Sequence, residues 1–422
     1  MEETLNLETT KKPTRISTEN KNWFLRIFFS LLSGLFLYLL CTPRNYHLFT
    51  WVCLIPFFYA CLLPDNLISH KKRFITGVIT GFFMHSFIFY WTGTSLGNFS
   101  GISGILLNIF APIALLIFAT LSGILYGIIA LILPTVKNNF PKTWGIIIAC
   151  FITFMEFSFP HIFPWHIGCG LTSVLPFFQL ASVFGIYGLT FLAVFINTTL
   201  FSTMESIRKK STFPKWTIIF SLVTLIVSYQ WGTQRVQMIQ KQIKSSDKTQ
   251  VAMIQSRLPK HKHFDELMRL SNRALGKGAE LLIWPENALN LNDFTEKNLL
   301  KIHEMIKKFQ VPMILGAIYY SQDKKSIYTS SLLVNKSGDF QGRYDKIKTV
   351  PITEGLPFGL QWPLSQKYTP AIFKIKKGEK RSYWSLFGKT FSPVICYEAI
   401  FSSFVRKNID GGANVIVNLT ND

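Results

Sequence analysis

Long apolar stretches fill the first half of the chain, and they constrain its fold more than any other feature. A transmembrane helix needs roughly 20 mostly apolar residues. Seven stretches before Gly232 meet or approach this length, at 23–41, 47–63, 74–94, 102–133, 143–159, 177–201 and 216–231. We therefore expect residues 23–232 to form a polytopic α-helical membrane bundle of about seven spans. Residues 1–22 are polar and lack a cleavage-site pattern, which indicates a cytoplasmic tail rather than a signal peptide.

Basic residues are distributed unevenly among the loops that connect these stretches. Lys and Arg are enriched in the cytoplasmic loops of membrane proteins. They cluster after the second, fourth and sixth stretches, at Lys71, Lys72, Arg73, Lys137, Lys142, Arg208, Lys209, Lys210 and Lys215, whereas the other loops have almost none. The pattern predicts a cytoplasmic N-terminus and a multi-pass protein of a bacterial inner membrane. It places everything after Gly232 in the periplasm.

Two residues inside the apolar half stand out. Pro112 lies early in the long fourth stretch, which predicts a tilt, a kink or a re-entrant start there. Glu156 is a carboxylate near the end of the fifth stretch, where charge is costly and often functional. The alternative is a structural, hydrogen-bonded group at the depth of the membrane interface, and we favour that interpretation.

The overall charge does not point to nucleic acid. The net charge is +21, but much of the excess lies in the loops that set the topology, and no nucleic-acid-binding motif is present. The sequence also lacks C-x-x-C and H-E-x-x-H spacings and a glycine-rich phosphate loop. We therefore expect no nucleic-acid partner, no metal and no diffusible cofactor.

From residue 251 onward, short apolar runs alternate with polar helical stretches. Strands are predicted at 251–255, 280–284, 312–319, 328–335 and 339–344, and helices at 263–277 and 293–309. The last two strands read as a hairpin. This alternation is typical of a layered α/β domain, which we place at residues 233–422.

Cys396 is the only cysteine of this second half, and it ends an apolar, strand-like run, Val-Ile-Cys-Tyr-Glu-Ala-Ile at 394–400. A lone cysteine is often a small buried hydrophobic residue. Two other stretches favour a nucleophile instead. Leu-Leu-Ile-Trp-Pro-Glu-Asn at 281–287 presents Glu286, a candidate general base, and Tyr-Asp-Lys at 344–346 presents Lys346, a candidate for stabilising an oxyanion. A thiol that attacks a carbonyl carbon needs both.

The motifs W-P-E, Y-x-K-x-x-x-V-P-x-x-E and I-C-Y-E, in this order and after a polytopic region, resemble the apolipoprotein N-acyltransferases, the membrane-bound branch of the nitrilase superfamily. The resemblance implies an α-β-β-α sandwich and a Glu286, Lys346 and Cys396 triad that forms a thioester acyl-enzyme. It implies a phospholipid acyl donor and, as acceptor, the amine of the diacylglyceryl-cysteine of an apolipoprotein. Lys348 is a rival to Lys346, but only Lys346 has the family's spacing to Pro351. Supporting or substrate-binding residues are expected at Glu354, Glu398, Tyr397 and Trp284.

The chain departs from the family in two places. Ile352 and Thr353 replace the usual Phe-Gly before Glu354, and the sequence stops at Asp422, before the rest of the nitrilase core and a last membrane helix, so the sandwich is expected to be incomplete. The proline-rich, aromatic stretch 349–367 is either packed or a lid for a lipid substrate. Two other functions stay open: a membrane-tethered carbon–nitrogen hydrolase (amidase) with water as acceptor, and a non-enzymatic binding or assembly partner.

Overall fold

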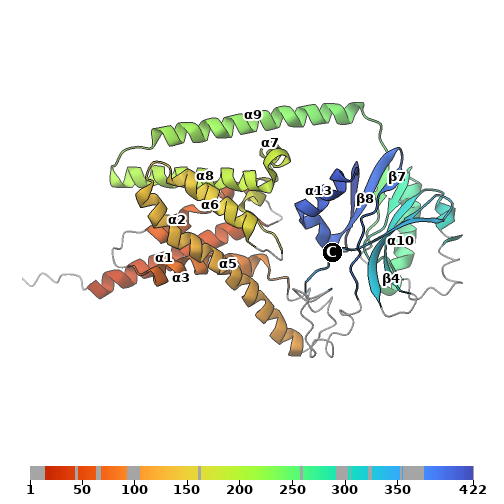
Figure 1. Cartoon of the computed structure of the whole chain (residues 1–422), viewed down its shortest axis with the longest axis horizontal. Coiled ribbons are helices and arrows are strands. Elements are labelled where there is room, and N and C mark those ends of the chain that lie inside the picture. Colours follow the sequence, from red (N-terminus) through yellow and green to blue (C-terminus); the bar gives the residue numbers. More distant parts are fainter. Residues whose placement is uncertain are drawn as a thin grey trace, which may run out of the picture. The chain divides into compact units, whose positions relative to one another are not determined.

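The computed structural model describes residues 15–42, 46–62, 68–92, 105–159, 163–256, 260–290, 303–304, 306–321, 326–351, 354 and 375–421. The chain forms two compact units (Figure 1). The first ends at Ser245 and is helical, and the second is formed mainly by residues 246–422. Helix α9 runs without a break through Gly232. The domain limits predicted from the sequence stay a prediction.

Helices or 3-10 turns form in each of the seven predicted apolar stretches. They are α1 (Arg15–Leu39), η1 (His47–Trp51), α2 (Ile55–Leu62), α3 (His70–Ile88), α5 (Ile105–Asn139), α6 (Trp144–Ser158), η2 (Ile167–Leu171), α7 (Leu175–Phe178), α8 (Ala181–Lys209) and α9 (Lys215–Ser245). In the described part of the chain, four helices are long and apolar enough to cross a membrane, at Asn22–Leu39, Ala111–Asn139, Ala181–Lys209 and Lys215–Ser245. The first unit is therefore a bundle of apolar helices, and the count of seven spans stays a prediction.

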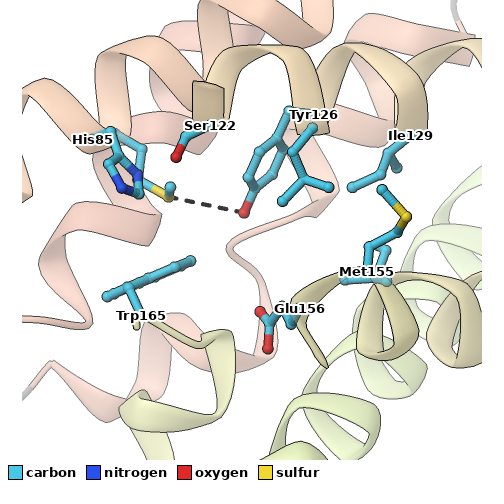
Figure 2. A pocket seen from close by; sticks show the side chains of 10 residues that line it. His85, Ser122, Tyr126, Ile129, Met155, Glu156 and Trp165 are labelled. Atoms are coloured by element: carbon cyan, nitrogen blue, oxygen red, sulfur yellow. Dashed lines mark hydrogen bonds between the residues drawn. The ribbon is translucent and has the colours of Figure 1, made fainter. Parts of the chain in front are cut away.

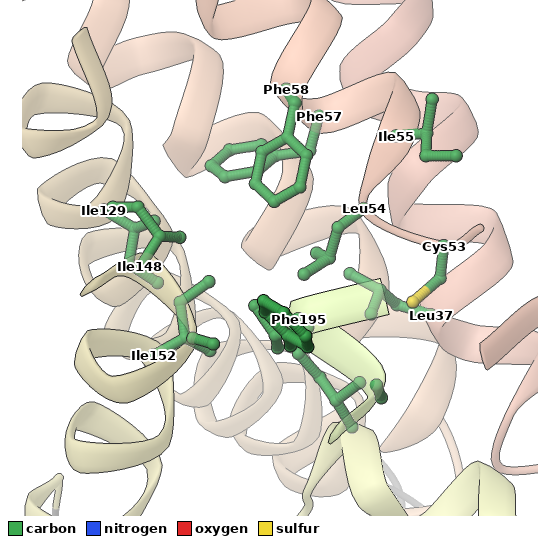
Figure 3. Close-up of a cluster of buried hydrophobic side chains, with 14 of the residues drawn as sticks. Leu37, Cys53, Leu54, Ile55, Phe57, Phe58, Ile129, Ile148, Ile152 and Phe195 are labelled. Atoms are coloured by element: carbon green, nitrogen blue, oxygen red, sulfur yellow. The ribbon is translucent and has the colours of Figure 1, made fainter. Parts of the chain in front are cut away.

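Aromatic and aliphatic side chains fill the centre of this bundle. Figure 3 shows Phe57 and Phe58 of α2 near Ile129 of α5 and Phe195 of α8, all buried. Helices α3 and α5 approach closely because glycine lies at their contact. A Cβ on Gly77 would lie 2.2 Å from the Tyr126 carbonyl oxygen. Small residues allow this kind of close helix packing in membrane proteins.

The expected irregularity at Pro112 does not interrupt a helix, since α5 continues through it. A break occurs instead in α8, where Gly185 has φ 65° and ψ −170°. Only glycine adopts such a conformation at little cost, so the kink is encoded by that residue. No predicted irregularity corresponds to this kink.

The second unit contains a six-stranded sheet and a three-stranded sheet. The first sheet has the order β1 (Val251–Met253), β2 (Leu281–Ile283), β4 (Met313–Tyr320), β5 (Ile327–Val334) and β6 (Phe340–Asp345), with β3 (Leu289–Asn290) paired to β4. Strands β1, β2 and β4 are parallel, and β4, β5 and β6 are antiparallel. The second sheet has the order β7 (Trp384–Leu386), β8 (Lys389–Ile395) and β9 (Val415–Leu419), with β8 and β9 parallel.

Two apolar cores hold these layers together. Leu281, Ile314 and Tyr344 of the first sheet pack with Phe391 and Ile395 of the second. On the opposite face of the first sheet, α10 (Lys260–Leu275) buries Leu267 against a second cluster. The layers therefore run helix, sheet, sheet. Helix α13 (Ser402–Asp410) lies between β8 and β9 of the second sheet in the chain, and its Phe404 is buried. These layers agree with the α-β-β-α sandwich that the resemblance implies.

The predicted strands and the hairpin of the second unit are confirmed, as is the helix at 263–277. Of the predicted helix at 293–309, only 303–304 and 306–309 are described, and they are helical. Strands β3, β7 and β9 were not predicted. The stretch 349–367 lies outside the described residues except for 349–351 and 354.

Candidate active site

The three residues of the predicted triad each follow the carboxyl end of a strand. Glu286 comes shortly after β2, Lys346 directly after β6, and Cys396 directly after β8. Pro285 has no N–H to donate to a neighbouring strand, so the β2 ladder ends before Glu286. The two sheets thus deliver a carboxylate, an ammonium and a thiol to one place.

Gly316 of β4 makes room for the base. A Cβ on Gly316 would lie 2.2 Å from the carbonyl oxygen of Pro285 and 2.7 Å from the Cα of Glu286. Both atoms belong to the backbone, so no side-chain rotation relieves the overlap. A glycine outside every motif of the sequence analysis therefore sets the position of Glu286.

Lys346 is buried between two carboxylates. Its Nζ donates to Glu286 Oε1 at 3.0 Å and to Glu354 Oε1 at 2.7 Å, and only 2% of its side chain is exposed. Burial alone would lower the pKa of Lys346, but the two carboxylates outweigh it and raise the pKa above its ordinary value. The lysine is therefore a fixed cation. Lys348 lies elsewhere, with its Nζ 4.2 Å from the Phe401 ring centroid.

Cys396 has an unusual backbone conformation and is hydrogen-bonded to the base. Its φ of 49° lies in the left-handed region, which costs a residue other than glycine about 1–2 kcal/mol. Its thiol also acts on Glu286, whose pKa it lowers through a side-chain hydrogen bond. Burial, and next the Glu286 carboxylate, raise the pKa of Cys396 to about 11, while Lys346 acts in the opposite direction. The resting thiol is therefore neutral and needs a base at the moment of attack.

Glu286 has the properties of such a base. Burial raises its pKa, Lys346 lowers it, and Glu354 raises it again. A carboxylate with increased proton affinity accepts a proton from a thiol more readily than an exposed one does. The second oxygen of Glu354 accepts a hydrogen bond from the Val350 N–H at 2.8 Å, which fixes that carboxylate beside Lys346.

Glu398 connects the lysine segment to the cysteine strand. One oxygen accepts from the N–H groups of Ile347 and Lys348 at 2.6 and 2.9 Å. The other accepts from the Tyr344 hydroxyl at 2.7 Å and from the Ile395 N–H at 2.8 Å. The carboxylate is fully buried and all four partners donate to it. Glu398 therefore holds the backbone on both sides of the site. It positions Lys346 through the N–H groups of the two residues that follow it, and not through a bond to Nζ.

Tyr397 and Trp284 occupy different surroundings. Tyr397 follows the nucleophile, and its ring packs edge to face on Phe401 at 4.9 Å. Trp284 is fully buried in the core shared with α10, where its Nε1 donates to Ser271 Oγ at 2.9 Å. The supporting or substrate-binding role expected for Trp284 stays a prediction.

Glu156 lies in the first unit, and its partners were not evident from the sequence. Its carboxylate accepts hydrogen bonds from the Ile167 N–H at 2.9 Å and the Thr190 hydroxyl at 2.7 Å, and it lies 3.2 Å from His166 Nδ1. Figure 2 shows Glu156 and Tyr126 at a cavity of about 20 Å³. The contacts tie α6 to η2 and α8, which agrees with the structural reading. Among the described residues, no cluster of three or more His, Cys, Asp or Glu is arranged to hold a metal ion.

Comparison with known proteins agrees with both units. The family model of the apolipoprotein N-acyltransferase N-terminal domain matches residues 33–199, and that of carbon-nitrogen hydrolases matches residues 250–422. The apolipoprotein N-acyltransferase of Geobacter metallireducens is 25% identical over 93% of this chain and 77% of its own length. The apolipoprotein N-acyltransferase of Wigglesworthia glossinidia brevipalpis is 24% identical over 94% of this chain and 80% of its own length. The solved structure of an amidase from Nesterenkonia is 17% identical in sequence. The alignment covers 41% of this chain and 64% of the amidase chain, with a TM-score of 0.31.

A helical membrane unit followed by a carbon–nitrogen hydrolase domain with adjoining Glu, Lys and Cys side chains defines a membrane-bound enzyme of the nitrilase superfamily. The two family models and the named relatives identify the family within this superfamily. The chain belongs to the apolipoprotein N-acyltransferase family. The resemblance inferred from its three motifs is confirmed.

Proposed function

We propose that this chain transfers an acyl chain from a phospholipid to the amine of the diacylglyceryl-cysteine of apolipoproteins, through a thioester on Cys396. The observation that carries the proposal is the contact of Glu286 with both Lys346 and the thiol. A buried base beside a neutral thiol and a fixed cation is what acyl transfer from an ester requires. The relatives named apolipoprotein N-acyltransferase support the choice of substrates.

In the first half-reaction, Glu286 takes the thiol proton and the sulfur of Cys396 attacks the ester carbonyl carbon of the phospholipid. Lys346 and a backbone N–H near Tyr397 stabilise the oxyanion. The ester C–O bond breaks, Glu286 returns its proton to the leaving alcohol, and a lysophospholipid departs. The thioester remains on Cys396.

In the second half-reaction, the amine of the lipoprotein attacks the thioester carbonyl carbon. Glu286 takes a proton from the amine, Lys346 again stabilises the oxyanion, and the C–S bond breaks. The sulfur leaves as a thiolate, which regains the proton that Glu286 holds. The product is an amide, and the two-step route predicts ping-pong kinetics.

Supporting roles follow from the contacts already described. Glu354 holds the ammonium of Lys346 together with Glu286, and Glu398 fixes the backbone beside Lys346 and before Cys396. We assign both to positioning. Tyr397 is assigned to the wall of the acyl pocket, because it adjoins the nucleophile and packs on another aromatic ring.

The proposal extends to the membrane. Seven spans, a cytoplasmic N-terminus and a periplasmic catalytic domain in a bacterial inner membrane follow from the alternating basic loops. The four long apolar helices and the shorter apolar helices at His47–Leu62 and Trp144–Ser158 support this arrangement. It places the catalytic domain on the side where the outer leaflet supplies phospholipid.

Intact mass spectrometry tests the proposal. The full chain, purified in lipid nanodiscs, is incubated with a phospholipid of defined acyl composition, as wild type and as Cys396→Ala, with Cys150→Ala as the matched control. We expect a gain of one acyl mass in wild type and in the control, none in Cys396→Ala, and discharge by a diacylglyceryl lipopeptide. Discharge by water alone would indicate the hydrolase, and an adduct that survives Cys396→Ala would refute the thioester.

A further inference from the structure

We propose that Thr420 is a further catalytic residue, whose hydroxyl donates a hydrogen bond to the sulfur of Cys396 and stabilises the thiolate in both half-reactions. The inference rests on the proposed function, because it gives a second partner to the proposed nucleophile. None of the motifs used in the sequence analysis contains Thr420.

Strand register brings the two residues together. Strands β8 and β9 are parallel neighbours, and Ile395 pairs with Leu419 at their carboxyl ends. Cys396 and Thr420 directly follow these two paired residues. Adjacent strands are about 4.8 Å apart, within reach of a hydroxyl and a sulfur on neighbouring side chains. A side-chain hydrogen bond from Thr420 acts to lower the pKa of Cys396.

Strand β9 is held firmly enough to fix this contact. The side chains of Val417 and Leu419 are buried in the core between the sheets, together with Ile395 of β8. Thr420 directly follows and is half-buried. Its hydroxyl is therefore positioned by the core and by the five residue pairs that join the two strands.

The charges around Cys396 leave a role for a neutral donor. Glu286 and Glu354 disfavour the thiolate, whereas Lys346 and Thr420 favour it. The ammonium of Lys346 already donates to both carboxylates, at 3.0 and 2.7 Å. Its charge is therefore largely compensated before a thiolate forms. A hydroxyl donor adds stabilisation at the sulfur itself, without another charge.

The contact affects both halves of the reaction. In acylation it increases the fraction of thiolate that Glu286 generates. In deacylation the sulfur is the leaving group, and a donor that stabilises the departing thiolate speeds C–S cleavage. A hydrogen bond to a charged group corresponds to about tenfold to a hundredfold in an equilibrium constant. We expect losses of this size in both steps when the hydroxyl is removed.

The test compares Thr420→Val, which keeps the shape, with Thr420→Ser, which keeps the hydroxyl. The full chain in nanodiscs is alkylated with iodoacetamide across a pH series, and modification of the peptide containing Cys396 is followed by mass spectrometry. We expect the midpoint to rise by about 1 pH unit or more in Thr420→Val and to stay near wild type in Thr420→Ser. Thr390→Val, a hydroxyl deletion earlier in β8, is the control and should leave the midpoint unchanged.

A second variant and a separate rate measurement complete the test. Thr420→Ala is a second variant without the hydroxyl, and it should shift the midpoint as Thr420→Val does. Rates of acylation and of thioester discharge are measured separately, and both should fall. An unchanged midpoint in Thr420→Val and Thr420→Ala, or an equal shift in Thr420→Ser, would overturn the inference. Failure of wild type to accept an acyl chain would refute the proposed function instead, because the alkylation profile does not depend on it.

Discussion

Substitution of Gly316 by alanine tests whether the backbone contact behind Glu286 controls catalysis. The added Cβ would lie 2.2 Å from the Pro285 carbonyl oxygen. Real Cβ atoms essentially never lie closer than 3.0 Å to another heavy atom, so the segment carrying Glu286 must move away by about 1 Å. A retreat of this size lengthens the 3.0 Å bond between Glu286 and Lys346 beyond hydrogen-bonding distance. Misplacement of a catalytic group by 1 Å costs about a hundredfold in rate.

The assay is the single-turnover rate of acyl-enzyme formation, followed by intact mass. We expect a decrease of about a hundredfold for Gly316→Ala, with the protein still folded and membrane-bound. The control is Gly276→Ala, whose Cβ would meet its nearest atoms at 3.6 and 3.7 Å, an ordinary contact. It should acylate at the wild-type rate. The reasoning is refuted if Gly316→Ala acylates as fast as the control, because Glu286 would then not depend on this contact.

Three other predictions follow from the same geometry. Glu398→Gln replaces one acceptor oxygen by a donor, so two of its four hydrogen bonds are lost at about 1.5–3 kcal/mol each. The melting temperature, followed by tryptophan fluorescence, should therefore fall, and an unchanged melting temperature would contradict this. Lys346→Met should slow acylation by about 10²–10³-fold, whereas Lys348→Met, which removes only a ring contact, should leave it within a few-fold; equal losses would mean that the wrong lysine was chosen. A base acts only when deprotonated, so acylation should increase with pH with a midpoint above 4.5, the ordinary pKa of Glu286, because burial raises that pKa; a midpoint at or below 4.5 would exclude Glu286 as the base.

The sequence predicted those parts of the site that depend on local pattern. Glu286 and Cys396 each follow an apolar run, and Lys346 follows the second strand of the predicted hairpin, so all three strand ends are visible in the sequence. Gly316 and Thr420 were missed, because each acts on a residue of another strand and the register of pairing is set by the whole sheet. The kink at Gly185 was missed for a related reason, since a glycine in an apolar helix is compatible with both a straight and a broken path.

The membrane half shows the same limit. An isolated carboxylate in an apolar stretch is visible in the sequence, but its hydrogen-bond donors are not. Glu156 receives its hydrogen bonds from η2 and α8, and nothing in the sequence near it indicates Ile167 or Thr190. Whether a buried charge is structural or reactive depends on such partners, so the pattern left both readings open.

The spacing of the active-site residues along the chain has a consequence for biosynthesis. Glu286 and Lys346 are 60 residues apart, and the thiol comes later still. A ribosome therefore delivers the base first, the cation next and the nucleophile last. Until β8 pairs with its neighbours, the thiol lacks both a base and a stabilised oxyanion. A nascent chain that is already inserted among phospholipids therefore does not react with their ester groups. The thiol becomes reactive only when the two sheets have packed together.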